Sequence, residues 1–131
     1  MRKLILLLTT LILSLTMMFA SPSYAEWVKV DENVKGTNYV DFERIRKVDG
    51  YVYYWELTNF SKPTNSGDLS VKVYLQGECK LFRYKILSFS IYSEPMGGGT
   101  GETANLSKKW KYPHPKSLGE TVLKTVCVFA N

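Results

Sequence analysis

The sequence predicts a single α+β domain, in which one antiparallel β-sheet meander packs on a C-terminal α-helix and one disulfide closes the fold. Two patterns support this fold class. Alternating apolar and polar residues recur through the middle of the chain, as in half-buried strands. Helical spacing of apolar residues appears only in the final stretch, "SLGETVLKTVCVFAN". A chain of 131 residues is large enough to bury one core and short for two domains.

The first 25 residues have the pattern of a secretory signal peptide. Arg2 and Lys3 precede an apolar run over residues 4–20, and the small residues Ser23 and Ala25 follow. We therefore predict cleavage after Ala25, an exported domain over residues 26–131, and a periplasmic, extracellular or cell-surface location. The alternative is an uncleaved membrane anchor, although the run is short and interrupted by Thr and Ser. After cleavage no membrane span is expected.

The charge and the cysteines narrow the class of protein. Cleavage removes Arg2 and Lys3 and lowers the formal net charge from +5 to +3, which does not suggest a nucleic-acid partner. Cys79 and Cys127 are the two cysteines, and an exported chain most simply joins them in one disulfide; two free buried thiols are the alternative. We expect no metal and no cofactor, because the single His114 leaves no plausible zinc site.

The strands are predicted in chain order. "EWVKV" and "NYVDF" give two short strands, and Asp49-Gly50 gives a tight hairpin turn. Residues 51–58 and 69–76 alternate as strands, and residues 78–94 form a long strand with a bulge. We expect three aromatic residues of residues 51–58 in the core, and two others exposed on the sheet or in cross-strand pairs. The core set is Tyr51, Tyr53 and Trp55, and the other set is Tyr54 and Tyr74.

The end of the chain predicts a helix. Ser117 followed by Glu120 is a capping box, in which each side chain accepts a hydrogen bond from a free backbone N–H of the first turn. A buried stripe follows at helical spacing, formed by Val122, Leu123, Val126 and Cys127. The disulfide then connects this helix to the start of the long strand.

The glycine-rich stretch "EPMGGGTGETANLSKKW" is not a phosphate-binding loop. Gly101 is followed by Glu102 and Thr103, where a P-loop needs Lys and Ser or Thr, and the dinucleotide-binding spacing is also absent. We expect residues 96–106 to be a flexible excursion between two sheet elements.

These segments together resemble the surface-adhesin protein E family of bacterial envelope proteins. The resemblance rests on Trp27, "YVDFERI", "YVYYWEL", "ECKLFRYKIL", the glycine-rich stretch, Trp110 and "PKSLGETVLKTVC", in this order. It implies an antiparallel sheet packed on a helix, a cysteine bridge, and adhesion to extracellular proteins for the family's named member. The chain lacks a lipid-attachment cysteine near the cleavage point.

No catalytic set is recognisable, so we expect a binding module and no enzyme. His114 lies between two prolines, and the acids Glu43, Glu56 and Glu78 show no pairing in the sequence. The candidate binding residues are Lys108, Lys109, Trp110, Lys111 and Tyr112, with Lys116 nearby, and their partner would be an acidic protein face or an anionic glycan. The alternative for this segment is that Trp110 belongs to the core and the lysines only solvate a strand end.

Two functions from different classes are consistent with these features. The first is an envelope binding module that adheres to proteins or glycans outside the cell. The alternative is a periplasmic accessory or inhibitor domain that acts on another envelope protein. Unpaired strand edges would also permit a homodimer.

Overall fold

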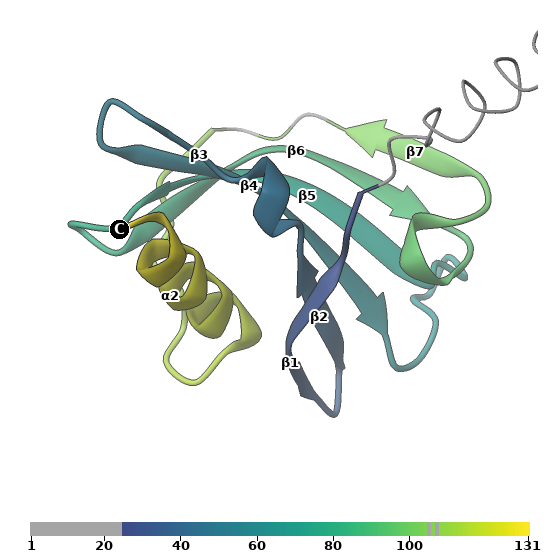
Figure 1. The fold of residues 1–131 in the computed structure, drawn as a ribbon. Helices are drawn as coiled ribbons and strands as arrows, with labels where there is room; N and C mark the ends of the chain where they lie inside the picture. The colour runs from purple at the N-terminus through teal and green to yellow at the C-terminus, as the bar shows by residue number, and fades with distance from the viewer. Residues whose placement is uncertain (1–24, 105, 107) are drawn as a thin grey trace, which may run out of the picture.

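The computed structural model describes residues 25–104, 106 and 108–131, so all of the predicted signal peptide except Ala25 lies outside the described residues. This part of the chain forms a seven-stranded sheet and one α-helix (Figure 1). The strands are β1 (Val28–Asn33), β2 (Gly36–Val40), β3 (Arg46–Val48), β4 (Tyr51–Phe60), β5 (Ser70–Glu78), β6 (Arg83–Tyr92) and β7 (Gly101–Ala104). The helix is α2 (Leu118–Ala130), and two short 3-10 turns are η1 (Phe42–Arg44) and η2 (Pro95–Gly97).

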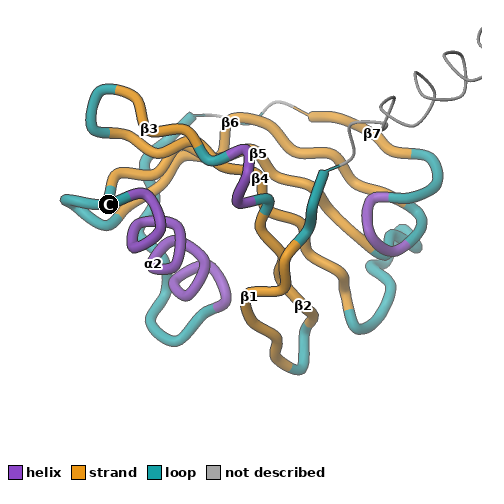
Figure 2. The backbone as a smooth tube through the Cα atoms, viewed as in Figure 1, coloured by secondary structure: helices purple, strands orange, loops and turns teal. Residues whose placement is uncertain are grey.

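The sheet is an antiparallel meander, as predicted. Its strand order is β1-β2-β4-β5-β6-β7, and β3 also pairs with β4. One edge of β4 is shared, because β2 pairs with residues 56–60 and β3 pairs with residues 51–53. Turn η1 connects these two partners. Figure 2 shows the strands as one curved layer with the helix on one side of it.

The hairpin between β3 and β4 turns at Asp49 and Gly50, as predicted. Both residues have positive φ, 51° and 82°, and Val48 pairs directly with Tyr51 across the turn. A two-residue turn of this kind matches the twist of the strands it joins. The Asp-Gly pair is therefore sufficient to set the register of this hairpin.

The predicted long strand over residues 78–94 begins too early. Strand β5 ends at Glu78, a turn follows, and β6 starts at Arg83. The turn needs an unusual backbone, with Phe82 at φ 51°. The predicted bulge is present, because the β5–β6 register shifts between Tyr74 and Leu75.

Helix α2 and one face of the sheet form the core. All four helix residues that the sequence placed in the stripe are buried, namely Val122, Leu123, Val126 and Cys127. Their sheet partners in the core cluster are Val40, Val52, Tyr54 and Leu75. At Gly77 the helix comes so close that an added Cβ would lie 3.0 Å from Leu123 Cδ1 and 2.9 Å from Val52 Cγ2. The absence of a side chain at Gly77 thus permits this packing.

The expected orientation of β4 is wrong. Tyr54 is 1% exposed and belongs to the core, whereas Tyr51, Tyr53 and Trp55 are only partly buried. The three partly buried rings point to the face opposite α2, because successive side chains of a strand alternate between faces. Tyr74 takes part in a cross-strand pair, which was one of its two expected roles: it lies directly opposite Trp55.

The helix start is capped nearly as predicted. Ser117 Oγ accepts a hydrogen bond from the Glu120 N–H at 3.1 Å. The return bond is displaced by one residue, because Glu120 Oε1 accepts from the N–H of Lys116, at 3.3 Å, rather than from that of Ser117. The free N–H groups of the first turn are therefore partly satisfied by side chains.

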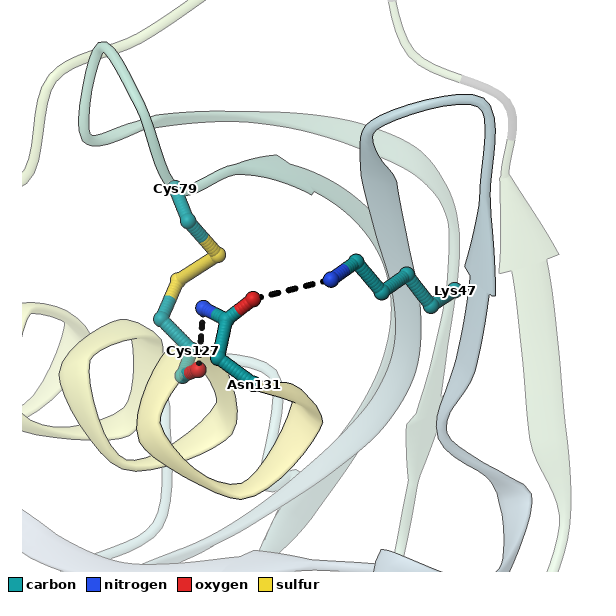
Figure 3. The surroundings of a disulfide bond; sticks show 4 residues. All are labelled: Lys47, Cys79, Cys127 and Asn131. Atoms are coloured by element: carbon teal, nitrogen blue, oxygen red, sulfur yellow. Dashed lines mark hydrogen bonds between the residues drawn. A yellow bond between two sulfur atoms is a disulfide. The ribbon is translucent and has the colours of Figure 1, made fainter.

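The helix end is held by the predicted disulfide and by a polar link. Cys79, in the turn after β5, is bonded to Cys127 of α2 (Figure 3). Asn131 donates from Nδ2 to the Cys127 carbonyl at 2.8 Å, and its Oδ1 accepts from Lys47 Nζ of β3 at 2.9 Å. The end of the helix is thus connected to two separate parts of the sheet.

We expected the glycine-rich stretch to be a flexible excursion between two sheet elements; its mobility remains a prediction, but the stretch contains regular structure. It forms η2 and then β7, which pairs with the second half of β6. Ser70 Oγ donates to the Glu94 carbonyl at 2.6 Å and accepts from the Gly97 N–H at 2.9 Å. Asn59 Oδ1 accepts from the Met96 N–H at 2.8 Å. These side-chain bonds from β4 and β5 provide partners for η2, a type of tertiary contact that the local sequence does not reveal.

Candidate functional site

The face of the sheet opposite α2, which we call the open face, carries a row of aromatic side chains. Tyr74 lies between its neighbours, with ring centroids 4.7 Å from Trp55 and 6.3 Å from Tyr53. None of the three rings is fully buried. Half-exposed aromatic rings supply flat apolar area together with a polar edge, a combination that suits a contact surface.

One end of this row is basic. The indole ring of Trp110 stacks on Tyr51 at a centroid distance of 5.8 Å. Two cations of β6 lie over the same indole, the Arg83 guanidinium at 4.3 Å and the Lys85 ammonium at 4.4 Å. Arg83 also lies 3.3 Å from the Glu78 carboxylate. Cation–π contacts of this kind help to fix the position of the ring.

The basic segment, residues 108–112, is attached to the sheet by its backbone. The N–H of Lys111 donates to the Tyr84 carbonyl at 2.8 Å, and the Tyr84 N–H donates back to the Lys111 carbonyl at 2.9 Å. The side chains of Lys108, Lys109 and Lys111 are exposed, and Tyr112 is 64% exposed. Trp110 is not among the core residues, so the alternative that it is buried in the core is wrong. All five predicted binding residues therefore lie together at the surface.

The other end of the row holds a pocket that the sequence did not reveal. Its volume is about 90 Å³, and its lining consists of Ala25, Trp27, Asp41, Arg44, Trp55 and Lys72. We call it the carboxylate pocket, because Asp41 is 1% exposed there. In "YVDFERI" this aspartate has the appearance of a strand-end turn residue, and nothing local indicates its burial.

The helix side of the sheet has its own partly buried carboxyl group. Glu56 accepts a hydrogen bond from Asn38 Nδ2 at 2.5 Å, and burial raises its pKa from 4.5 to about 7. A cavity of about 140 Å³ adjoins it, lined by Tyr54, Glu56, Val73, Leu75, Tyr84, Ile86 and Gly119. Burial also raises the pKa of both tyrosines. The cavity is mostly apolar and lies under the start of α2.

Two of the three acids considered for catalysis have structural partners. Glu78 lies beside Arg83, and Glu56 accepts from Asn38. Over residues 25–104, 106 and 108–131, no three His, Cys, Asp or Glu side chains gather in an arrangement that could hold a metal ion. In that same part of the chain no helix has the length and apolar character needed to span a membrane.

Comparison with known proteins agrees with the fold. The sequence profile of the family described as "Surface-adhesin protein E" matches residues 27–128. No curated protein sequence matches the chain. Among solved structures, crystal form II of Haemophilus influenzae protein E is similar, with 16% identity and a TM-score of 0.66 over 84% of this chain and 94% of that one.

Two further structures give the same result. One of Haemophilus influenzae protein E has 17% identity and a TM-score of 0.62, over 82% of this chain and 87% of that one. Protein E from non-typeable Haemophilus influenzae has 17% identity and a TM-score of 0.61, over 82% and 79%. These likenesses concern the fold, whereas the family match covers most of the sequence. The chain belongs to the surface-adhesin protein E family.

Proposed function

We propose that this chain is an exported, non-catalytic binding module that adheres to a polyanionic partner outside the cell, either an acidic protein face or an anionic glycan. The observation that carries the proposal is the position of the basic segment. Its three lysines are exposed around Trp110, and two further cations lie on the ring. Membership of a surface-adhesin family supports the same class of function.

The arrangement separates anchoring from contact. Trp110 is held by Tyr51, Arg83 and Lys85, and the backbone of Lys111 is paired with β6. The lysine side chains and Tyr112 then extend from a fixed strand-like base. A fixed base lowers the entropy lost on binding, since less of the surface has to be ordered. The lysines speed encounter with a negative partner, and the exposed tyrosine adds contact area.

The direct test reverses three charges, with Lys108, Lys109 and Lys111 each changed to Glu. Capture on immobilised hyaluronan and on immobilised polyglutamate is measured over a range of salt concentrations. We expect capture to weaken on the order of tenfold or more at low salt, and its salt dependence to become shallower. The melting temperature should stay nearly unchanged, because these side chains are exposed.

A matched control reverses three exposed lysines elsewhere, Lys35, Lys62 and Lys124, which lie in the β1–β2 turn, in the β4–β5 loop and on α2. The net charge change is the same, so a general charge effect would weaken both triple variants equally. If the basic-segment variant captures both polyanions as well as the control does, this segment is not the contact surface.

A location experiment separates adhesion from the alternative, a periplasmic accessory or inhibitor domain. Protease is added to intact cells and, in parallel, to lysed cells. We expect cleavage in both samples if the module acts outside the cell. Protection in intact cells with loss after lysis would favour the periplasmic role.

A further inference from the structure

The carboxylate pocket contains an unusual acid. Asp41 is 1% exposed, and neither carboxylate oxygen has a hydrogen-bond donor within the described residues. The nearest cation is Arg44, whose Nε lies 3.3 Å from Oδ2 in an ionic contact. The Arg44 side chain is itself 46% exposed. A buried carboxylate without hydrogen bonds is costly, so Asp41 is a strong acceptor for any donor group that enters the pocket.

The walls of the pocket restrict which donor can enter. Arg44 and Lys72 line it as well, so a second cation would be repelled by two positive charges. An anion would be attracted by Arg44 and Lys72, but it would be repelled by Asp41 at close range and would leave that carboxylate without a donor. A purely apolar ligand would cover the indole rings of Trp27 and Trp55, which also line the pocket, but it would leave the carboxylate without a donor. The occupant therefore has to be uncharged where it enters, with hydrogen-bond donors and acceptors at its edge and an apolar face.

A sugar ring in the pyranose form meets all three requirements. Each hydroxyl both donates and accepts, so neighbouring hydroxyls can donate to Asp41 while they accept from Arg44. Lys72 Nζ lies over the Tyr92 ring, 4.9 Å from its centroid, and is a further donor once it turns toward the pocket. The C–H face of the ring is apolar and suits the indole faces of Trp27 and Trp55. With Ala25 in place the pocket volume of about 90 Å³ equals about three water molecules, which admits the edge of the ring and leaves the remainder at the surface; the predicted cleavage removes Ala25 and widens this wall.

We propose that the carboxylate pocket binds the hydroxyl edge of a pyranose and is the terminal subsite of a glycan that lies along the open face. The inference builds on the proposed function, because it takes the open face as the binding surface and selects a glycan as the partner. From the pocket, Trp55 leads directly to Tyr74 and then to Tyr53. The row thus offers stacking positions between the pocket and the basic segment.

The three tryptophans of the chain make the test specific. Trp27 and Trp55 line the pocket, and Trp110 lies in the basic segment. Exported protein with isotope-labelled indoles is titrated by NMR with millimolar methyl glycosides of glucose, galactose, mannose and N-acetylglucosamine. We expect at least one glycoside to shift the indole N–H signals of Trp27 and Trp55 saturably, and to leave that of Trp110 in place.

Variants then connect the signal to the residues. Asp41→Asn should weaken binding by about tenfold or more, since an amide replaces the carboxyl group as acceptor. Lys72→Met, which keeps a long side chain at this half-buried position and leaves Asp41 in place, should weaken it by several-fold if Asp41→Asn fails to fold. The matched control is Asp49→Asn, in the β3–β4 turn, where asparagine suits the positive φ and affinity should be unchanged.

Three results would overturn the subsite. The first is that no glycoside moves the Trp27 and Trp55 signals; the second is equal affinity in wild type, Asp41→Asn and Lys72→Met. The third concerns the N-terminus that cleavage creates at Glu26. If the pKa of its α-amino group is raised in wild type and not in Asp41→Asn, the chain's own N-terminus fills the pocket. Loss of the subsite with polyanion capture intact would leave the proposed function standing.

Discussion

The two faces of the sheet differ in how their side chains are packed. On the helix side, apolar residues of α2 and the strands bury one another, and a disulfide fixes the helix end. On the open face, rings stack on rings and cations lie over rings, and these groups remain partly exposed. The helix side therefore contains the core cluster, whereas the aromatic row and its cations on the open face can change at lower cost and are suited to recognition.

Among the tests of this difference between the two faces, removal of the disulfide has the largest expected effect. Cys79→Ser together with Cys127→Ser should lower the free energy of unfolding by about 4 kcal/mol, because the bridge closes a loop with a sequence separation of 48 residues. The double variant is compared with wild type by denaturant titration, and α2 should become sensitive to protease. Addition of reductant serves as the control: it should weaken wild type to the same level and leave the double variant unaffected.

A pair of truncations compares the two faces directly. Leu123→Ala should cost about 3 kcal/mol, because it leaves a cavity in the closed core. Tyr74→Ala should cost about 1 kcal/mol, since its ring is partly exposed and mainly loses its two aromatic neighbours. Both are measured by thermal and denaturant unfolding. Equal losses would mean that the open face contributes to stability as much as the core does.

Glu56→Gln tests how ionisation of Glu56, on the helix side, affects the stability of the domain. Burial raises the pKa of Glu56 to about 7, above its value in the unfolded chain, so the folded state holds the proton more tightly. Stability should therefore fall as pH rises from about 4 to 7, and level off above that. At about pH 8 the variant should be more stable than wild type by roughly 3 kcal/mol, and the gain should shrink toward about pH 5.

The measurement is the unfolding free energy across this pH range. Gln can still accept from Asn38, so the hydrogen bond is conserved while the charge is removed. Glu43→Gln, an exposed acid of η1, is the matched control and should show no such dependence. A constant difference between Glu56→Gln and wild type at every pH would contradict the raised pKa.

The smallest expected effect concerns the helix cap. Ser117→Ala removes the side-chain acceptor for the Glu120 N–H and should cost about 1 kcal/mol. Thermal unfolding measures it, with Ser66→Ala, at an exposed loop position, as the control. None of the stability variants on the helix side should change the binding of polyanions by folded protein. A change there would mean that the two faces are coupled.

The parts of the fold that were predicted correctly depend on local rules. The turn at Asp49-Gly50, the cap at Ser117 and the helix stripe each follow from residues that are close together in the sequence. The orientation of β4 failed because both of its faces carry apolar rings. Tyr51, Tyr53 and Trp55 give the more regular pattern, yet α2 packs on Val52 and Tyr54. Only the position of the helix decides between the faces, and the strand sequence does not contain it.

For the same reason, the basic segment of the candidate site could be predicted from the sequence and the carboxylate pocket could not. The basic segment is continuous in sequence, so its composition indicated a binding surface before its location was known. The carboxylate pocket brings together Trp27, Asp41, Trp55 and Lys72 from four different parts of the chain. Asp41 has no special sequence context; it lies between β2 and η1, and the other residues that line its pocket come from distant parts of the chain. Such a site emerges only from the tertiary structure.

The Cys79–Cys127 bridge also determines how cleavage of the domain would be detected. Strands β6 and β7, turn η2 and the basic segment all lie between the two cysteines. A single trypsin cut at the exposed lysines of the basic segment would therefore leave two fragments joined through sulfur. On a non-reducing gel the nicked molecule would migrate near the intact one, and it would separate only after reduction. A cell-surface digestion run on a gel without reductant would thus record an accessible protein as a protected one.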